Sequence, residues 1–317
     1  MTLLLQYTLF FASVLILVAL GGCFSEHSGV INLGLEGIMV VGGMGGALSM
    51  RYIAEHFPNS SAFMIILVSI LMAVIFGMVY SLLLAVACIN FNADQTIVGT
   101  AMNMLATAAA TVIIKAINTS KSAGNVSSVI EYIKPKEAFM IRIGKYFELS
   151  WFAIITVVLL VAAYVTLYKT KFGLRLMACG EYPQAAASVG INVYAMRYAG
   201  VLISGALGGI GGLSYITAGA SEWKFEEGVA GFGFLALAVM IFGQWKPTRI
   251  ALAALLFGVF RALSNVKEAI PVLASLKIPG QIYTMMPYII SLIVLAFTSK
   301  KSRAPKAEGI PYDKGQR

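Results

Sequence analysis

The sequence predicts an all-α, polytopic membrane protein, a bundle of about nine transmembrane segments, with a range of roughly eight to ten. Of its 317 residues 59% are hydrophobic and only 12% are charged, whereas soluble domains carry roughly 25% charged residues. The apolar runs are ~20 residues long and do not alternate, which favours helices over the strands of a barrel. Since lipid offers the backbone no hydrogen bonds, the N–H and C=O groups of each helix have to bond within that helix.

The predicted spans follow one another between short polar interruptions. They cover residues 3–23, 30–50, 62–90, 95–115, 150–168, 194–218, 229–244, 247–264 and 281–298. The segments 24–50 and 229–264 are candidates for short or re-entrant elements. Residues 1–298 thus form a single transmembrane domain, followed at 299–317 by a basic tail that we expect to be poorly ordered.

Two spans are rich in glycine. Gly42 and Gly46 are four residues apart in the second span, a spacing of small residues that lets helices approach closely. The span at 194–218 carries a second set of small residues, Gly205, Gly208, Gly209, Gly211 and Gly212. We expect both spans to pack closely against neighbours.

The fourth span begins at a predicted helix start, Asn92-Ala93-Asp94-Gln95, with Asn92 as the cap. Polar and small residues then recur every fourth position, at Gln95, Gly99, Asn103, Thr107 and Thr111. This spacing places them on one helix face. Because polar groups facing lipid are costly, that face is predicted to point into the bundle or a wet cavity.

A polar segment at 169–197 interrupts the apolar spans about halfway along the chain. It predicts a very short helix that starts at Pro183, where a missing N–H costs nothing, and ends at Gly190 in a left-handed residue. The basic residues Lys169, Lys171, Arg175 and Arg197 flank it. Local features favour a docking surface and an ordinary loop equally.

The distribution of Lys and Arg predicts the orientation. If 169–197 is cytoplasmic, 12 of the 23 Lys and Arg residues lie on its side of the membrane. Long loops translocate regardless of charge, so the loop at 118–148 is discounted, which leaves a clear positive-inside bias. Segment 169–197 and the tail are then cytoplasmic, and 118–148 is external. The net charge of +9 is explained by these loops rather than by nucleic acid.

Most catalytic chemistry has no support in the sequence. The three cysteines show no paired spacing, and the two histidines have no partner at ligand or triad spacing, so neither a metal site nor a hydrolytic site is predicted. There is no P-loop and hence no ATP site in this chain. Gly231-Phe232-Gly233-Phe234-Leu235-Ala236 fits a dinucleotide pattern, but without a preceding strand it is interpreted as helix packing.

Transport remains, and it needs polar groups at membrane depth. Candidates for a substrate path are Asn32, Gln95, Asn103 and Thr107; for each the alternative is helix–helix hydrogen bonding or capping. Glu36, one turn from Asn32, is expected to hold structure rather than solute. A neutral solute is favoured because no span centre holds an unpaired Lys, Arg or Asp.

Several motifs resemble one family of transporters. Residues 25–39, SEHSGVINLGLEGIM, resemble the opening signature of bacterial ABC-importer permeases of the branched-chain amino acid and simple sugar superfamily. Residues 180–191, GEYPQAAASVGI, are similar to the cytoplasmic coupling segment of these permeases. Residues 232–239, 243–247 and 257–258 also resemble family sequence. The nucleoside permeases are the subgroup that the chain resembles most.

The resemblance implies a mechanism and a set of partners. Two permease subunits, this one and a second that is expected to be a paralogue, form the pathway in the bacterial cytoplasmic membrane. A separate ABC ATPase binds the ATP, so no cofactor is expected here, and this subunit is not an enzyme. A solute-binding lipoprotein delivers the small-molecule solute outside. Glu181, Pro183, Ala186 and Gly190 would dock the ATPase, whose closure would switch access.

Other functions remain open at this point. Within the superfamily the solute could be a simple sugar or a branched-chain amino acid. An ion-gradient-driven secondary transporter would prefer ionisable residues at span centres, and the sequence offers essentially none. A non-transport membrane protein would need a reactive cluster or a large soluble domain, and neither is evident.

Overall fold

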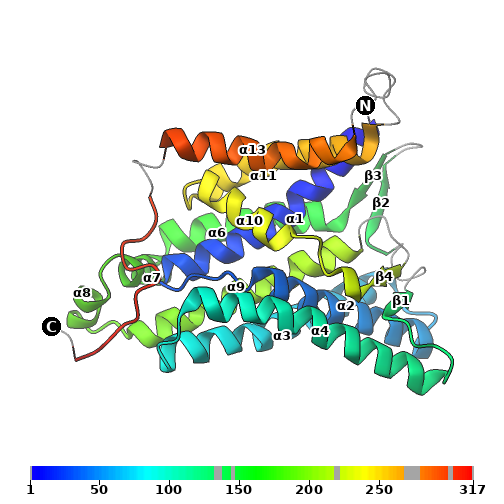
Figure 1. The fold of residues 1–317 in the computed structure, drawn as a ribbon, viewed down its shortest axis with the longest axis horizontal. Helices are drawn as coiled ribbons and strands as arrows, with labels where there is room; N and C mark the ends of the chain where they lie inside the picture. The colour runs from blue at the N-terminus through cyan, green and yellow to red at the C-terminus, as the bar shows by residue number, and fades with distance from the viewer. Residues whose placement is uncertain are drawn as a thin grey trace.

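The computed structural model describes residues 2–131, 138–143, 147–217, 222–267, 279–298 and 303–315, and shows an elongated helix bundle (Figure 1). The long helices are α1 (Thr2–His27), α2 (Leu35–His56), α3 (Ala62–Ala85), α4 (Gln95–Lys121), α6 (Trp151–Lys169), α9 (Val193–Ile216), α11 (Pro247–Val266) and α13 (Gly280–Thr298). The shorter helices are α7 (Lys171–Glu181), α8 (Pro183–Ser188) and α10 (Phe232–Phe242). The bundle has an end that carries α8, the "α8 end", and an opposite "sheet end" with short strands.

The all-α membrane bundle is confirmed. Among the described residues, seven helices are long and apolar enough to cross a membrane, namely α1, α2, α3 with its π-helical extension Val86–Asn90, α4, α6, α9 and α11. The predicted span at 281–298 is α13, with 19 residues. The predicted span at 229–244 is instead the 11-residue helix α10. At 1.5 Å per residue α10 is about 16 Å long, roughly half a bilayer core.

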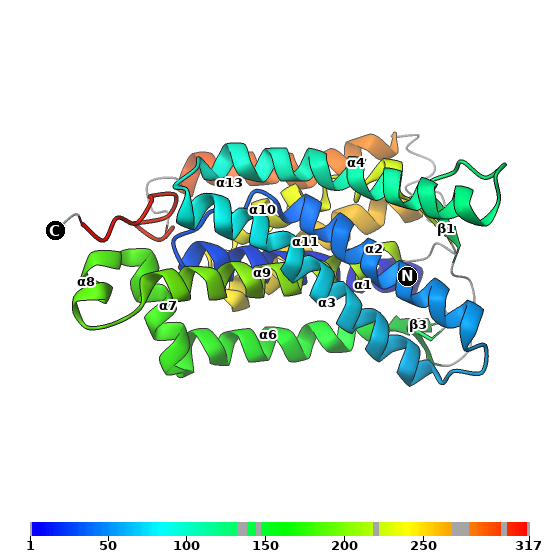
Figure 2. The same ribbon diagram turned by 90° about the horizontal axis from the view of Figure 1, so that it is seen from below.

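The interior of the bundle is formed by α1, α2 and α9, which Figure 2 shows in its middle. These helices are the most buried of the candidate spans, and glycine explains why they approach so closely. A Cβ atom on Gly212 would lie 1.9 Å from the carbonyl oxygen of Met39, and one on Gly42 would lie 2.3 Å from the Cα of Gly209. The predicted close packing of both glycine-rich spans is therefore confirmed.

The helices α3, α4 and α6 lie on the outside, with α4 and α6 on opposite sides of the bundle (Figure 2). Their apolar side chains are exposed, among them Phe63, Val112 and Val157. Such a surface is stable in contact with lipid or with another apolar protein surface, because hydrocarbon then replaces water.

The sheet end holds short antiparallel strand pairs that the sequence does not predict. Strand β1 (Val129–Glu131) pairs with β4 (Glu222–Lys224), and β2 (Met140–Ile143) pairs with β3 (Phe147–Ser150). The segment predicted as the loop 118–148 therefore contains the end of α4 and three strands, with residues 132–137 and 144–146 outside the described part.

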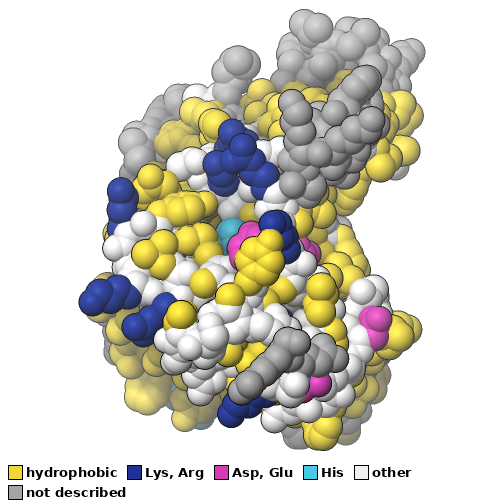
Figure 3. Space-filling model, turned by 90° about the vertical axis from the view of Figure 1, so that its left-hand side faces the viewer, with side chains coloured by type: hydrophobic (Ala, Val, Ile, Leu, Met, Phe, Trp, Pro, Cys, Tyr) yellow, Lys and Arg dark blue, Asp and Glu magenta, His cyan; other side chains and the backbone are white. Residues whose placement is uncertain are grey.

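Charge is distributed differently at the two ends. Ion pairs lie at the sheet end, where Glu226 binds Lys115 at 2.6 Å and Glu55 binds both Arg51 and Lys121. The hydrogen bond from Lys115 lowers the pKa of Glu226 below its usual value. Figure 3 views the α8 end, where Lys and Arg side chains are spread over the face among apolar ones and acidic side chains are few.

Two local predictions are wrong. Asp94, not Asn92, caps α4: its Oδ1 accepts hydrogen bonds from the N–H groups of Thr96 and Ile97, both at 2.9 Å. Asn92 instead turns the chain with a φ of 51°. The tail, expected to be poorly ordered, folds against the α8 end over residues 303–315, where the side chains of Ala307 and Tyr312 are buried.

We predict that Gly212→Val destabilises the protein, because its side chain has no space beside Met39. Overpacking of this kind costs about 1–3 kcal/mol. The thermal unfolding midpoint in detergent should fall. Gly124→Val is the matched control, since a Cβ there would meet no atom within 4 Å. Equal midpoints for the two variants would contradict the close packing of α2 and α9.

Candidate translocation site and coupling segment

The chain leaves helical structure between α1 and α2, inside the bundle. Residues 28–34 are turn or irregular, and Asn32 is fully buried among them. Its Nδ2 donates to the hydroxyl of Ser204, near the middle of α9, at 2.8 Å, and its Oδ1 accepts from the N–H of Gly34 at 3.1 Å. This helix break, residues 28–34, therefore lies inside the bundle, with Asn32 beside the middle of α9.

The polar face of α4 meets the helix break, as the four-residue spacing predicts. The Oε1 of Gln95 accepts from the N–H of Ile31 at 2.6 Å. Asn103 uses both ends of its amide: Oδ1 accepts from the N–H of Gly37 and Nδ2 donates to the carbonyl of Leu33, each at 2.8 Å. These bonds satisfy backbone groups that the break leaves without helical partners.

The predicted path residues Asn32, Gln95, Asn103 and Thr107 thus gather around one feature. Asn103 and Thr107 are half-buried, and the hydroxyl of Thr107 donates to the carbonyl of Asn103 at 3.4 Å. The Nε2 atom of Gln95 is buried with no hydrogen-bond partner among the described residues. Their bonds support the helix-tying alternative, and their role toward solute stays a prediction.

Glu36 joins the helix break to a second one, the turn residues 228–231 directly before α10. Its two carboxylate oxygens accept from the N–H groups of Gly231 and Gly233, at 2.8 and 2.6 Å, across 195 and 197 residues of sequence. These donors are at the start of α10, where a carboxylate both satisfies free N–H groups and complements the helix dipole. Two helices, α2 and α10, therefore begin next to each other inside the bundle.

The structural role expected for Glu36 is confirmed, but its partner is not evident from the sequence. The feature of the sequence that could have indicated the partner is the glycine pair Gly231-x-Gly233. Gly231 has a φ of 77°, and a Cβ on Gly233 would lie 2.4 Å from the backbone nitrogen of Glu36. The dinucleotide-like pattern is thus helix packing, as interpreted.

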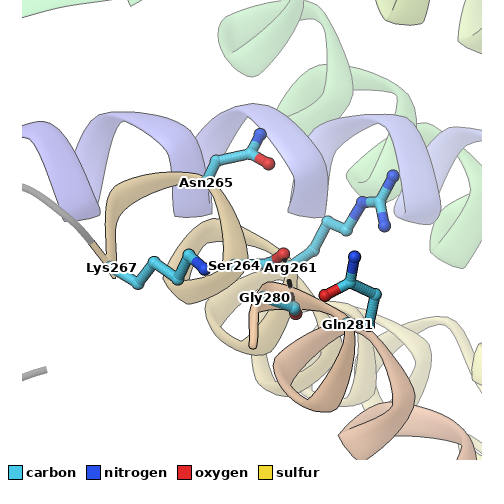
Figure 4. Close-up of a pocket in the computed structure, with 6 residues that line it drawn as sticks. All are labelled: Arg261, Ser264, Asn265, Lys267, Gly280 and Gln281. Carbon is cyan, nitrogen blue, oxygen red and sulfur yellow. Dashed lines mark hydrogen bonds between the residues drawn. The ribbon is translucent and has the colours of Figure 1, made fainter. Parts of the chain in front are cut away.

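A polar pocket of about 300 Å³ lies between α11 and α13 (Figure 4). It is lined by Arg261, Ser264, Asn265, Lys267, Gly280 and Gln281. In Figure 4 the Gln281 amide points toward the Arg261 guanidinium, while Lys267 lies at the other side. The guanidinium lies over the ring of Phe232, with 5.1 Å between its carbon and the ring centroid, so the pocket borders the start of α10.

The coupling segment predicted at 169–197 contains two helices. The sequence predicts α8, with Pro183 in its first turn and Gly190 beyond its end at a φ of 83°. It does not predict α7, whose cap is Thr170, with its hydroxyl accepting from the N–H of Gly173 at 3.2 Å.

The four predicted docking residues point in two directions. Glu181 and Gly190 are exposed, whereas Pro183 and Ala186 are buried. Ala186 packs in a small apolar cluster with Cys179, Val193 and Tyr312. Pro183 and Ala186 therefore hold α8 against the protein. The exposed surface at α8 includes the flanking residues Tyr182 and Val189.

Arg197 is not part of the basic surface predicted around α8. It is 1% exposed, and its Nη2 donates to the carbonyl of Ile310 in the tail at 2.9 Å. The sequence gives no sign of this contact, because the residues are 113 positions apart.

We predict that Glu36→Gln loosens the start of α10. A glutamine can accept with one oxygen only, so an N–H of Gly231 or Gly233 loses its partner, which costs about 1–3 kcal/mol. The unfolding midpoint should fall relative to Glu222→Gln, an exposed control in β4. Matching midpoints would show that Glu36 does not hold α10.

Comparison with known proteins agrees with this architecture. Residues 4–297 match the family model described as "branched-chain amino acid transport system / permease component". The chain is 38% identical to the guanosine ABC transporter permease protein NupQ of Bacillus subtilis, covering 100% of this chain and 98% of that protein. It is 39% identical to the nucleoside ABC transporter permease protein NupC of Lactococcus lactis, covering 97% and 96%.

A more distant relative is a putative glucose ABC transporter permease protein of Haloferax volcanii, 27% identical over 93% of this chain and 91% of that protein. The family consists of permease components, which are transport subunits and not enzymes. With its apolar helices and a family match over nearly its whole length, the chain is a multi-pass membrane protein that belongs to the ABC transporter permease family.

Proposed function

We propose that this chain is the permease subunit of an ATP-driven ABC importer for nucleosides. The observation that carries the proposal is α8, a short helix fixed by Pro183 and Gly190 and presented at one end of a bundle whose sequence has no P-loop. Two relatives above 35% identity are a guanosine and a nucleoside permease. ATP would be bound by a separate ATPase seated on the α8 end.

The helix breaks supply the groups that a neutral solute needs. Two helix N-termini, those of α2 and α10, meet at Glu36, whose carboxylate accepts from the N–H groups of Gly231 and Gly233. The amides of Gln95 and Asn103 and the hydroxyl of Thr107 lie beside them. Movement of α8 would rearrange the breaks and switch access between the two sides.

The remaining partners follow from the two ends. The α8 end, with its basic side chains, faces the cytoplasm of a bacterial cell and the sheet end faces outward, by the positive-inside rule. A second permease subunit, a paralogue, would complete the pathway. A solute-binding lipoprotein would deliver nucleoside at the sheet end.

The second candidate is a simple sugar, supported by the glucose permease relative. Both solutes are neutral and rich in hydroxyl groups, so the polar groups at the breaks suit either.

We predict that proteoliposomes holding the full transporter accumulate a radiolabelled nucleoside only when ATP and the ATPase subunit are present. Binding of guanosine, other nucleosides and glucose to the lipoprotein would name the solute. Uptake that persists without the ATPase and follows a proton or sodium gradient would refute the ABC mechanism. Uptake of glucose alone would select the second candidate.

We predict that Gly190→Val weakens ATPase docking, because a β-branched residue does not accept a φ of 83° and the end of α8 would shift. Co-purification of the ATPase with the permease should fall by about tenfold, the effect of ~1.4 kcal/mol. Gly190→Asn is the control, since asparagine tolerates this conformation. Full retention of the ATPase by the Gly190→Val variant would remove this role from α8.

A further inference from the structure

The tail crosses the α8 end and touches both the coupling segment and the helix break. Figures 1 and 2 show it at the α8 end, next to α7 and α8. No part of the function proposed above uses it. Its contacts fall into two sets, one on each side.

The first set holds the tail to the coupling segment. The Nζ of Lys306 donates to the hydroxyl of Tyr182 at 2.6 Å, and the N–H of Ala307 donates to the carbonyl of Gly180 at 2.8 Å. Tyr312 belongs to the apolar cluster of Ala186, Cys179 and Val193.

The second set holds the tail to the helix break. The N–H of Gly309 donates to the carbonyl of Gly29 at 3.2 Å. Gly309 has a φ of 76°, and a Cβ on it would lie 2.9 Å from the side chain of Ile31, so the tail lies directly on the break. Ile31 is the residue whose N–H is held by Gln95.

Buried polar groups fix the tail between these two sets. Arg197 donates to the carbonyl of Ile310, and the carboxyl group of Glu308 lies close to that of Glu26 at the end of α1. Burial raises the pKa of Glu308. Glu26 also accepts from the indole N–H of Trp245, which follows α10.

We propose that the tail is a coupling strap: residues 303–315 move with α8 and pass its displacement to the helix break. The proposal rests on the docking role of α8 and adds residues of the same machinery. It assigns Tyr312 and Lys306 to the α8 side and Gly309 to the break side. They are positioning residues, because they act on the break and not on the solute.

The test separates transport from ATP hydrolysis in the reconstituted full transporter, with nucleoside as the solute. In Gly309→Val the break side of the strap is disrupted while Lys306 and Tyr312 keep their contacts. We expect ATPase co-purification to be unchanged and the number of nucleosides moved per ATP to fall by about tenfold. Tyr312→Ala should lower the same ratio. Lys314→Ala, an exposed position in the tail, should match the wild type.

A cross-link tests whether strap and α8 move together. Tyr182→Cys with Lys306→Cys, joined by a flexible bis-maleimide, replaces their contact by a covalent one. The native Cys23, Cys88 and Cys179 are buried, and burial raises the pKa of the Cys179 thiol, so labelling is confined to the new pair. Transport after cross-linking should equal that of the same double-cysteine variant before cross-linking, which is the reference because Tyr182 belongs to the exposed surface beside α8.

Four outcomes would overturn the strap. They are a wild-type transport ratio in Gly309→Val, a higher ratio after deletion of 303–317 (which would make the tail an inhibitor), loss of ATPase binding in Gly309→Val, and arrest of transport by the cross-link. Failure of the α8 proposal itself is distinguishable, because the Gly190→Val variant would then keep its ATPase.

Discussion

The structure depends on hydrogen bonds that satisfy interrupted helices inside an apolar bundle. A helix that stops at mid-depth leaves N–H and C=O groups that lipid cannot satisfy, at a cost of several kcal/mol each. Here Asn103 hydrogen-bonds the backbone of Gly37 and Leu33, and Gln95 that of Ile31. Glu36 accepts from the N–H groups at the start of α10. Without these side chains the chain would be driven toward continuous helices, and no polar groups would be present at membrane depth.

Close packing brings these side chains within reach. Asn103 meets the backbone of Gly37 because neither Gly37 nor Gly99 has a side chain to keep α4 away from α2. A Cβ on Gly37 would lie 2.9 Å from the carbonyl oxygen of Met102, and one on Gly99 would lie 2.8 Å from the Cβ of Leu33. Glycine therefore has two effects in this bundle. It allows helices to touch, and it lets polar side chains reach the backbone of a neighbouring helix.

Features set by local chemistry could be predicted from the sequence. The apolar runs, the polar face of α4 and the short helix between Pro183 and Gly190 all depend on neighbouring residues. The length of α10 could not be predicted, because residues 229–244 are apolar throughout and hydropathy does not reveal where a helix begins. Its start is set by Glu36, nearly 200 residues away. The tail is similar: its composition is typical of disorder, and its order comes from distant partners such as Arg197 and Gly29.

Strand β4 and Trp245 lie at the two ends of one stretch of chain, and α10 lies between them. Residues 222–224 pair with β1 at the surface, residues 225–231 lead inward, and Trp245 binds Glu26 beside the tail. One stretch, 222–245, is therefore anchored at the sheet end by β1, inside the bundle by Glu36, and at the α8 end by Glu26. Few residues separate either end of this stretch from the paired helix starts, so a displacement at either end would be passed on to those helix starts. The short helix α10 would therefore pivot about the carboxylate of Glu36, which holds its first residues.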